Sequence, residues 1–552
     1  MGFEELLNQV GNFGKFHIRQ MALIFFISMA IASHIVLENF TAATPGHRCW
    51  VHIIDDDTLS INNTTVLNQD ALLRISIPLD SNLRPEKCRR FVHPQWHLLH
   101  FNETFLNMSE PDTEPCVDGW VYDRNNFPST IVTEWNLVCD NKAKKPMAQF
   151  LFLTGMLIGS FIISPLSDWL GRKFVLRCCL LTFSLCGIGA AFAPNFIIYC
   201  SLRFLMGCTA TSIIINSSML VTEWSRPQSK PLAVLVLSCA FSSGNILLGG
   251  LAYVFQEWRT LMLTLCVPHL VFFLTSRWII ESARWLIITN KPDKGLKALK
   301  RVARINGLKN AGETLNIEVV SVTMQQALEE AQKKKTVFDL VRTPNMRKRI
   351  CLIAFVRSSA ILSYYGIIVN LQHFGNNIFL FQTLFGIIST SARFLGFFVV
   401  RKTGHRSNQM FLYFLVGIFI FTTSLVPQEM QVLRVTLACV ALSLISVAFN
   451  EYGVHFVELT PTVLRARASM VDSVSSRCGA ALAPILMTLE MHLPILPWIF
   501  YSIAPILSAF LLFFLPETKD MPLPDTIEDV EKNHKKSRKE NAKESCMKVT
   551  KF

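Results

Sequence analysis

A single cation inside an apolar run, Arg477, offers the most specific chemistry in this sequence. The run 468–489 is mostly small and apolar, and Arg465 and Arg467 come just before it. At 1.5 Å per residue, Arg477 would lie about 15 Å into the run, close to the middle of a ~30 Å hydrocarbon core. A guanidinium at that depth costs ~2.5–3.5 kcal/mol to insert and usually faces a watery cavity or a partner. We therefore predict that Arg477 binds the anionic group of a small molecule. The alternative is a structural ion pair with an acid such as Asp472.

The composition indicates a membrane protein around this arginine. The chain has 552 residues, of which 51% are hydrophobic and 17% are charged, whereas a soluble domain carries about 25% charged residues. The formal charge of +13 is unevenly distributed along the chain. Residues 41–145 hold 10 Lys/Arg and 14 Asp/Glu, whereas residues 281–349 hold 15 Lys/Arg and 7 Asp/Glu. Such side-specific charge is typical of membrane proteins and argues against a nucleic-acid partner.

The apolar runs predict an all-α membrane protein with twelve spans. Lys15 and Arg19 precede the first span, and an even number of spans returns the chain to the same side, so both termini (residues 1–20 and 516–552) and the basic loop 281–349 should be cytoplasmic. The first six spans fall in residues 21–280 and the last six in residues 350–515. The predicted spans are 21–37, 147–167, 174–193, 196–221, 231–255, 258–280, 350–369, 378–400, 409–425, 431–457, 468–489 and 495–515.

The long segment after the first span, residues 41–145, has the features of a folded extracellular loop. N-x-S/T sequences, which require a lumenal surface, mark four glycosylation candidates. An even set of four cysteines suits two disulfides on an oxidising side, and all three pairings remain open. The candidate glycosylation sites are Asn62, Asn63, Asn102 and Asn107, and the cysteines are Cys49, Cys88, Cys116 and Cys139.

Charged motifs at the predicted cytoplasmic ends of the spans repeat at offsets of 233 to 236 residues. Glu223 and Lys230 recur as Glu458 and Arg465, DWLGRK at 168–173 recurs as RKTGHR at 401–406, and Glu281 recurs weakly as Glu517. The repeat predicts two six-span halves related by an axis along the membrane normal, whose rocking exposes a central site to each side in turn. The predicted gating residues are Asp168, Gly171, Arg172, Lys173, Glu223, Lys230, Glu458 and Arg465.

The loop between the second and third spans, SDWLGRK, resembles the signature loop of the major facilitator superfamily, with Ser164 and Trp169 as departures. Three further motifs, ENFTAATPGHRC, ESARWL and LPETK, resemble the organic ion transporter family, solute carrier family 22, over essentially the whole chain. The resemblance implies the major facilitator fold with a large extracellular loop. In the anion-carrying branch, cations stand where this chain has Arg393 and Arg477, so the resemblance implies an organic anion carrier.

The same resemblance implies aromatic walls and a particular substrate class. Tyr364 and Tyr365 match the anion branch, and their rings can stack on an aromatic or steroidal body; Phe241 and Phe449 match other lining positions. Ile35 replaces an Asn of relatives that carry small hydrophilic anions, and Arg357 replaces an aromatic residue. We therefore expect bulky amphipathic anions, such as steroid sulfates, glucuronides or bile-acid-like conjugates. Arg357 could instead pair with Glu451, and Arg203 in the fourth span is interpreted as structural.

The sequence holds no GxxxxGK[ST] loop for ATP, so we expect a secondary or facilitative carrier. No cofactor or metal site is predicted, and we do not expect an enzyme. The expected location is the plasma membrane. A dicarboxylate, chloride or bicarbonate could serve as counter-anion. The alternatives are a cation or zwitterion carrier (carnitine-like) of the same family, and a receptor or channel, which would not need the repeated gate motifs. The basic loop 281–349 should touch lipid headgroups, and the C-terminal Thr550-Lys551-Phe552 fits a PDZ ligand.

Overall fold

The computed structural model describes residues 3–11, 14–56, 69–80, 83–96, 112–226, 228–308, 337–375, 377–399, 404–461, 463–518, 524, 528, 530 and 531. The chain forms two compact units. The larger contains Met1–Asn39, Pro146–Val254 and Met262–Phe552, and the smaller contains Phe40–Lys145 and Phe255–Leu261.

Long apolar helices make up the larger unit, and each of the twelve predicted spans coincides with one of them. The N-terminal bundle is α2 (Lys15–Ile35), α8 (Lys145–Leu170), α9 (Arg172–Ala191), α10 (Phe196–Trp224), α11 (Lys230–Val254) and α12 (Trp258–Thr275). The C-terminal bundle is α17 (Pro344–Ile368), α18 (Ile378–Val399), α19 (His405–Leu425), α20 (Gln431–Leu459), α21 (Arg465–Met487) and α22 (Leu496–Leu512). Within the described residues, ten helices are long and apolar enough to cross a membrane; α22 is apolar but shorter. The helix α21 differs because it carries the charged residues of the candidate site.

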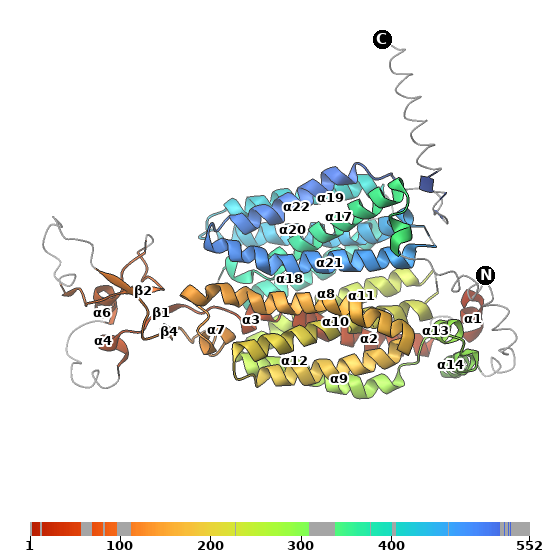
Figure 1. Ribbon diagram of the computed structural model, residues 1–552, viewed down its shortest axis with the longest axis horizontal. Coiled ribbons are helices and arrows are strands. Elements are labelled where there is room, and N and C mark those ends of the chain that lie inside the picture. The colour runs from red at the N-terminus through yellow and green to blue at the C-terminus, as the bar shows by residue number, and fades with distance from the viewer. Residues whose placement is uncertain are drawn as a thin grey trace, which may run out of the picture. The chain divides into compact units, whose positions relative to one another are not determined.

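The two bundles repeat the same packing. Helix α9 packs on α10 as α19 packs on α20, and α2 packs on α11 as α17 packs on α21 (Figure 1). The bundles meet where α11 packs against α18. The internal repeat in the sequence is therefore also a repeat of helix packing, and the candidate site residues come from helices at this junction.

Small residues allow the closest helix approach in the N-terminal bundle. A Cβ on Gly155 of α8 would lie 2.2 Å from the carbonyl oxygen of Phe204, and one on Gly159 would lie 2.2 Å from that of Cys208. The spacing Gly-x-x-x-Gly lets the backbones of α8 and α10 touch, which is how membrane helices associate where lipid removes the hydrophobic driving force.

A layer of short helices covers one end of the N-terminal bundle: α1 (Phe3–Val10), α13 (Ala283–Ile288) and α14 (Pro292–Ile305). Leu6 and Leu7 of α1 are buried in one cluster with Trp285 and Leu299. The side chain of Asn306 fixes the N-terminal segment, because its Oδ1 accepts the N–H of Phe16 at 3.0 Å and its Nδ2 donates to the carbonyl of Val10 at 3.1 Å.

The smaller unit contains two short antiparallel sheets. Strand β1 (His47–Cys49) pairs with β4 (Trp120–Tyr122), and β2 (Arg89–Phe91) pairs with β3 (Thr113–Pro115). Short helices complete the unit: α3 (Glu38–Thr41, shared with the larger unit), α4 (His52–Asp55), α6 (Gln69–Ser76), α7 (Ile131–Glu134) and the 3-10 helix η2 (Cys139–Lys144).

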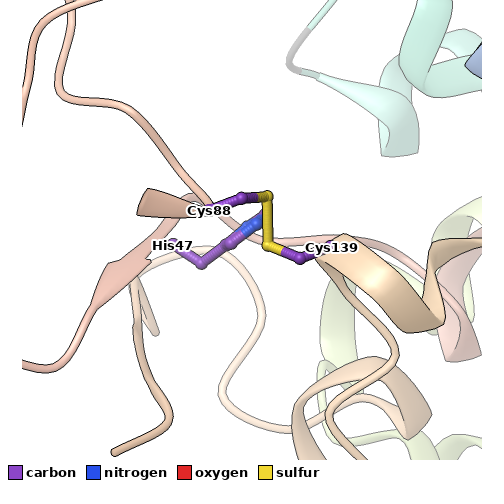
Figure 2. A group of neighbouring side chains, drawn as sticks. All are labelled: His47, Cys88 and Cys139. Carbon is purple, nitrogen blue, oxygen red and sulfur yellow. A yellow bond between two sulfur atoms is a disulfide. The ribbon is translucent and has the colours of Figure 1, made fainter. Parts of the chain in front are cut away.

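Two disulfides close the smaller unit, Cys49–Cys116 and Cys88–Cys139. The prediction of two disulfides is confirmed, and the structure selects one of the three pairings. His47 lies beside the second disulfide (Figure 2). Burial is the main cause that lowers the pKa of His47, and the positive charges of Lys87 and Lys142 lower it further. The four candidate glycosylation sites and the C-terminal PDZ motif lie outside the described residues.

Candidate substrate site and gate

One face of α17 carries Arg357, Tyr364 and Tyr365. The spacing of seven between Arg357 and Tyr364 is two helical turns, so both side chains lie on the same side of the helix. Both tyrosines are buried, and their ring centroids lie 5.7 Å apart in an edge-to-face arrangement. The guanidinium of Arg357 is stacked 5.1 Å from the ring centroid of Tyr452, so this face of α17 is both aromatic and cationic.

The ring of Phe449 on α20 joins the predicted residues. Its centroid lies 5.6 Å from that of Tyr364, 5.4 Å from the guanidinium of Arg357 and 5.8 Å from that of Arg393. A ring between two guanidiniums is a cation–π arrangement that holds charges near an apolar wall. Five of the seven residues predicted to bind substrate are thus in one cluster: Arg357, Tyr364, Tyr365, Arg393 and Phe449.

Arg393 on α18 links this cluster to the N-terminal bundle. It is 7% exposed, and its Nη1 donates to the carbonyl of Ser238 on α11 at 3.2 Å. Phe241 lies one helical turn beyond Ser238 and is half-buried. Ile35 is buried at the end of α2, where its carbonyl accepts the Nε2 of Gln149 at 2.6 Å.

Arg477 on α21 is half-buried, and its Nε makes no hydrogen bond within the described part of the chain. The nearby acid, Asp472, accepts a hydrogen bond from the hydroxyl of Tyr452 and lies 3.7 Å from the Nε of Arg357. The carboxylate of Asp472 is therefore ion-paired with Arg357. The electrostatic neighbours of Arg477 are Tyr365, the cation of Arg357 and, without an ion pair, the same carboxylate of Asp472.

The alternative partner considered for Arg357, Glu451, is wrong. Glu451 is fully buried on the side of α20 that packs against α19, where it pairs with His405 Nδ1 at 3.0 Å and accepts from Asn408. The cluster consequently has three guanidiniums, those of Arg357, Arg393 and Arg477, around the single carboxylate of Asp472. A cluster of this composition can attract an anion and can stack its apolar body on aromatic rings.

Buried amides near the ends of these helices connect the two bundles. Asn39 Nδ2 donates to the carbonyl of Ile368 at 2.7 Å and to Gln382 Oε1 at 3.0 Å, and Gln382 Nε2 donates to Asn245 Oδ1 at 3.2 Å. We call Asn39, Asn245 and Gln382 the amide bridge. Sequence reasoning missed it, although single amides within apolar runs are a signal for such contacts.

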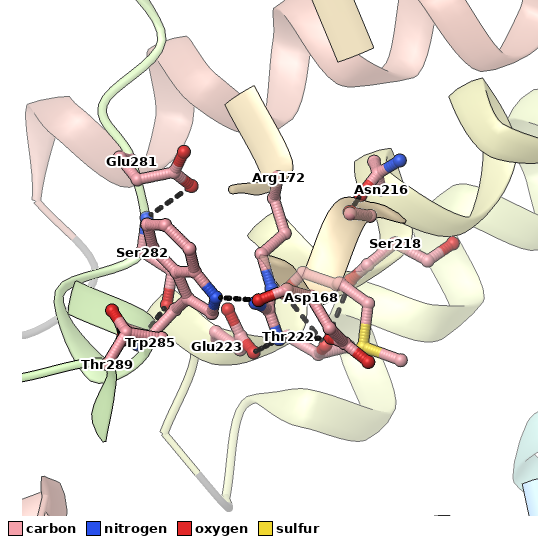
Figure 3. A network of polar contacts seen from close by, with 12 residues as sticks. Asp168, Arg172, Asn216, Ser218, Thr222, Glu223, Glu281, Ser282, Trp285 and Thr289 are labelled. Carbon is pink, nitrogen blue, oxygen red and sulfur yellow. Dashed lines mark hydrogen bonds and ion pairs between the residues drawn. The ribbon is translucent and has the colours of Figure 1, made fainter. Parts of the chain in front are cut away.

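Three of the predicted gate residues, Asp168, Arg172 and Glu223, lie in one network of polar contacts (Figure 3). The guanidinium of Arg172 lies 3.0 Å from a carboxylate oxygen of Asp168 and 3.5 Å from one of Glu223. Trp285 donates its Nε1 to the carbonyl of Asp168 at 2.7 Å, and its ring lies 5.6 Å from the Arg172 guanidinium. The tryptophan of the ESARWL motif thus belongs to this network, a role that sequence reasoning did not assign.

The turn before α9 requires glycine. Gly171 has φ +103° and ψ 148°, a conformation that other residues rarely adopt, and a Cβ there would lie 2.7 Å from Glu281 Oε2. That oxygen accepts the N–H of Lys173 at 3.0 Å, and Lys173 Nζ donates to the carbonyl of Arg277 at 3.0 Å. Burial raises the pKa of Glu281, although the hydrogen bonds from the backbone N–H groups of Ser282 and Lys173 oppose the shift.

The C-terminal bundle repeats this network with a histidine in place of an arginine. His405 stands where the repeat places the counterpart of Arg172, and its Nε2 lies 3.7 Å from Glu458. Glu458 also accepts from the hydroxyl of Thr518 at 2.6 Å. Arg465 donates to the carbonyl of Val457 at 3.1 Å at the start of α21, and Lys230 begins α11.

Arg203 on α10 lies away from these groups. It is fully buried, its Nε lies 2.9 Å from Glu38 Oε1, and its guanidinium is stacked 4.3 Å from the ring centroid of Phe152. Tyr199 donates its hydroxyl to the same oxygen of Glu38 at 2.9 Å. This buried, ion-paired cation fits the structural role expected for it.

Comparison with protein families and curated proteins gives full-length matches. The family model described as "Sugar (and other) transporter" matches residues 122–529. The chain is 58% identical over 542 residues to human solute carrier family 22 member 10, covering 98% of this chain and 100% of that protein. It is 50% identical over 552 residues to the human steroid transmembrane transporter SLC22A24, covering 100% of both.

Comparison with solved structures gives a match to the inward-open conformation of the xylose transporter XylE from E. coli. The TM-score is 0.61 at 15% identity, and the match covers 93% of this chain and 99% of that chain. At this identity the likeness concerns the arrangement of the helices alone.

Proposed function

Because the chain belongs to solute carrier family 22 and has the major facilitator fold, we propose that it carries amphipathic organic anions across the plasma membrane. Membership of this family, at 58% identity to one member, makes the chain a multi-pass membrane transporter of organic solutes rather than an enzyme. The family and the all-α fold predicted from the sequence are both confirmed. The charge of the substrate, its molecular scaffold and the driving force for transport are what we propose beyond family membership.

The excess of guanidiniums in the central cluster is the observation that carries the proposal. Within the described residues, Arg393 and Arg477 form no ion pair with a carboxylate, while the one acid of the cluster, Asp472, lies beside Arg357. A desolvated guanidinium without an anion is unfavourable, and a carboxylate or sulfate can supply two parallel hydrogen bonds to it. A bound organic anion would therefore complete this site.

The aromatic residues support a bulky, flat substrate body. Tyr364, Tyr365 and Phe449 present ring faces and edges beside the cations, and Phe241 is proposed to line the other side. A relative that is 50% identical over the whole chain is named a steroid transmembrane transporter. Together these features favour steroid sulfates, steroid glucuronides and bile-acid-like conjugates over small dicarboxylates.

The transport cycle follows from the two-bundle architecture. Rocking of the bundles about the central cluster would give alternating access, with the Asp168–Arg172–Glu223 network closing the proposed cytoplasmic side. Transport would proceed by facilitated diffusion or by exchange for a dicarboxylate, chloride or bicarbonate. Both termini are proposed to lie in the cytoplasm.

Transport of a cation or zwitterion is the second candidate, and Asp472 is the observation that favours it. Its side chain is 20% exposed, so a ligand ammonium could reach it. Arg357 and Tyr452 already contact this carboxylate, however, and a ligand cation would also have to approach three guanidiniums.

The proposal is tested by measuring the uptake of estrone sulfate, an anion, and of tetraethylammonium, a cation, in the same transfected cells. Estrone sulfate should accumulate and tetraethylammonium should not. Arg477→Asp should lower uptake of the anion by about a hundredfold or more, because like charges placed together cost several kcal/mol, whereas Arg477→Lys should retain part of it. Surface biotinylation confirms equal expression. Uptake of tetraethylammonium by the wild type, or undiminished anion uptake by Arg477→Asp, would refute anion carriage.

A further inference from the structure

We propose that a basic surface beside the N-terminal bundle binds the phosphorylated headgroup of a phosphoinositide in the adjoining membrane leaflet. The basic surface consists of Lys294, Lys297, Arg301 and Arg304 on α14, Lys173 and Arg177 on α9, and Arg277 on the 3-10 helix η3 (Ser276–Trp278). The leaflet is the inner one if the proposed cytoplasmic placement of this end is right.

Helix α14 presents its cations on a single exposed face. Lys294, Lys297, Arg301 and Arg304 are exposed and spaced by three, four and three residues, so they follow one another along one side of the helix. The opposite side is buried against α13 and α1 and includes Leu299 and Val302. The buried side fixes which way the cations point, and the helix carries one acid, Asp293.

Cations from two other elements adjoin this face. Lys173 Nζ donates to the carbonyl of Arg277 at 3.0 Å, and both Arg177 and Arg301 lie close enough to repel the Lys173 ammonium. The Nε of Arg177 is buried without a hydrogen bond in the described part of the chain, while its guanidinium lies 5.4 Å from the ring centroid of Phe273. Positive charge is thus concentrated where α9, η3 and α14 meet.

The acid nearest to these cations does not neutralise them fully. The side chain of Glu281 accepts the backbone N–H of Lys173 at 3.0 Å and that of Ser282 at 3.0 Å. Its charge also faces Arg172 of the gate network. Seven cations therefore share this surface. Of the exposed acids nearby, Asp293 lies on α14, and Asp168 is paired with Arg172 of the gate network.

Exposed tryptophans place the basic surface at the level of lipid headgroups. Trp278, directly after Arg277, is 69% exposed, and Trp169, four residues before Lys173, is 76% exposed. Tryptophan side chains with such exposure at the ends of membrane helices mark the membrane–water interface. The basic surface is therefore within reach of headgroup phosphates.

Charge complementarity selects the kind of lipid. Clusters of four to eight Lys or Arg directly beside a membrane helix, or on an amphipathic helix, attract phosphoinositides and phosphatidylserine. A headgroup with several phosphates can contact α9, η3 and α14 together, whereas the single net charge of phosphatidylserine cannot. We therefore commit to a polyphosphorylated inositol headgroup rather than to an acidic protein segment.

Thermal melting of the purified full-length protein in neutral detergent tests this site. Short-chain phosphatidylinositol 4,5-bisphosphate should raise the melting temperature at a lower concentration than short-chain phosphatidylserine does. The triple variant Lys294→Gln, Lys297→Gln, Arg301→Gln should need about a hundredfold more of the bisphosphate, since each basic residue near an anionic surface contributes about a fivefold factor.

The matched control neutralises three exposed cations at the same end of the C-terminal bundle, Arg342→Gln, Arg347→Gln and Lys348→Gln, and should respond like the wild type. The single variants Lys294→Gln and Arg301→Gln, each about fivefold weaker, test the site if the triple variant fails to fold. No response of the wild type, an equal response to both lipids, or equal loss in both triple variants would overturn the site. None of these readouts requires transport, so failure of this site is distinguishable from failure of the proposed function.

Discussion

At the scale of residues, the ion pair that Asp472 forms determines which arginines of the central cluster lack a carboxylate partner. The sequence placed Asp472 five residues before Arg477 and suggested an ion pair between them. The structure pairs Asp472 with Arg357 on another helix, and Tyr452 donates to the same carboxylate. Within the described residues Arg477 therefore forms no ion pair with a carboxylate, which supports the proposal that it binds the substrate anion.

The pairing predicts a specific coupling between Asp472 and Arg357. Asp472→Asn should lower the melting temperature, because it leaves the guanidinium of Arg357 in the cluster without its carboxylate. The double variant Arg357→Gln, Asp472→Asn should recover most of the loss, with a coupling free energy of about 1–3 kcal/mol. Asp472→Asn combined with Arg477→Gln provides the control, and equal recovery in that control would assign Asp472 to Arg477 instead.

Residue types in the candidate site could be predicted, but their partners could not. The positions of Arg393, Arg477, Tyr364 and Tyr365 follow from apolar runs and from a family resemblance. The partner of Arg357 is a carboxylate 115 positions along the chain, on α21, and depends on how α17 and α21 are rotated about their axes. A period of 3.6 residues defines one face of a helix, but it does not say which helix that face meets.

At the scale of elements, the turns that join neighbouring helices differ between the bundles. Gly171 before α9 has φ +103°, whereas its counterpart in the repeat, Gly404 before α19, has φ −71°. A Cβ on Gly404 would lie 3.1 Å from Glu517 Oε2, against 2.7 Å from Glu281 Oε2 for Gly171. Only the first turn demands a residue without a side chain.

Alanine at the two glycines should therefore have unequal effects. Gly171→Ala should destabilise the protein by about 1–3 kcal/mol, since its backbone conformation is essentially restricted to glycine. Gly404→Ala keeps an ordinary conformation and should cost less than about 1 kcal/mol. Melting temperatures of the two purified variants give the comparison, and a larger loss for Gly404→Ala would contradict it.

The spans were predictable as elements, and their ends were less so. The predicted span 409–425 corresponds to α19, which begins four residues earlier at His405. Hydropathy excludes these polar residues, but His405 and Asn408 both bind the buried Glu451 and so continue the helix beyond the apolar run. A buried acid on α20 thus sets the start of α19.

At the scale of the whole molecule, the amide bridge ties one bundle to the other near the proposed extracellular side. Asn39 and Asn245 belong to the N-terminal bundle side, and Gln382 belongs to α18. All three are buried, so the hydrogen bonds between the bundles are shielded from water. An outward-facing state would have to break these bonds.

Breaking the bridge should favour the outward-facing state. Gln382→Ala removes two hydrogen bonds between the bundles, worth about 1–2 kcal/mol together, and so should lower the apparent Km for uptake severalfold by populating the state that binds external substrate. Gln149→Ala is the matched control, because that buried amide donates to Ile35 within the N-terminal bundle. Uptake kinetics at equal surface expression distinguish the two, and an equal change in Km would rule out a gating role.

The two-bundle organisation was predictable because the gate motifs repeat at nearly constant offsets, and the contacts between bundles were not. In the sequence, Asn39 is marked only by the tripeptide Asn39-Phe40-Thr41, which fits the N-x-S/T glycosylation pattern. A single amide in an apolar run has the same local pattern whether it binds within its own bundle or across to the other. Gln149 and Gln382 illustrate the two cases.

The docking of α1 on α14 has a consequence for the order of events during synthesis. Asn306 contacts Phe16 across 290 positions of the chain, and at about 5–20 residues per second a ribosome needs roughly 15 to 60 s to make that interval. Until then Leu6 and Leu7 lack the surface that buries them. Helix α1 therefore gains its packing partner only after the six long helices α2, α8, α9, α10, α11 and α12 have been made.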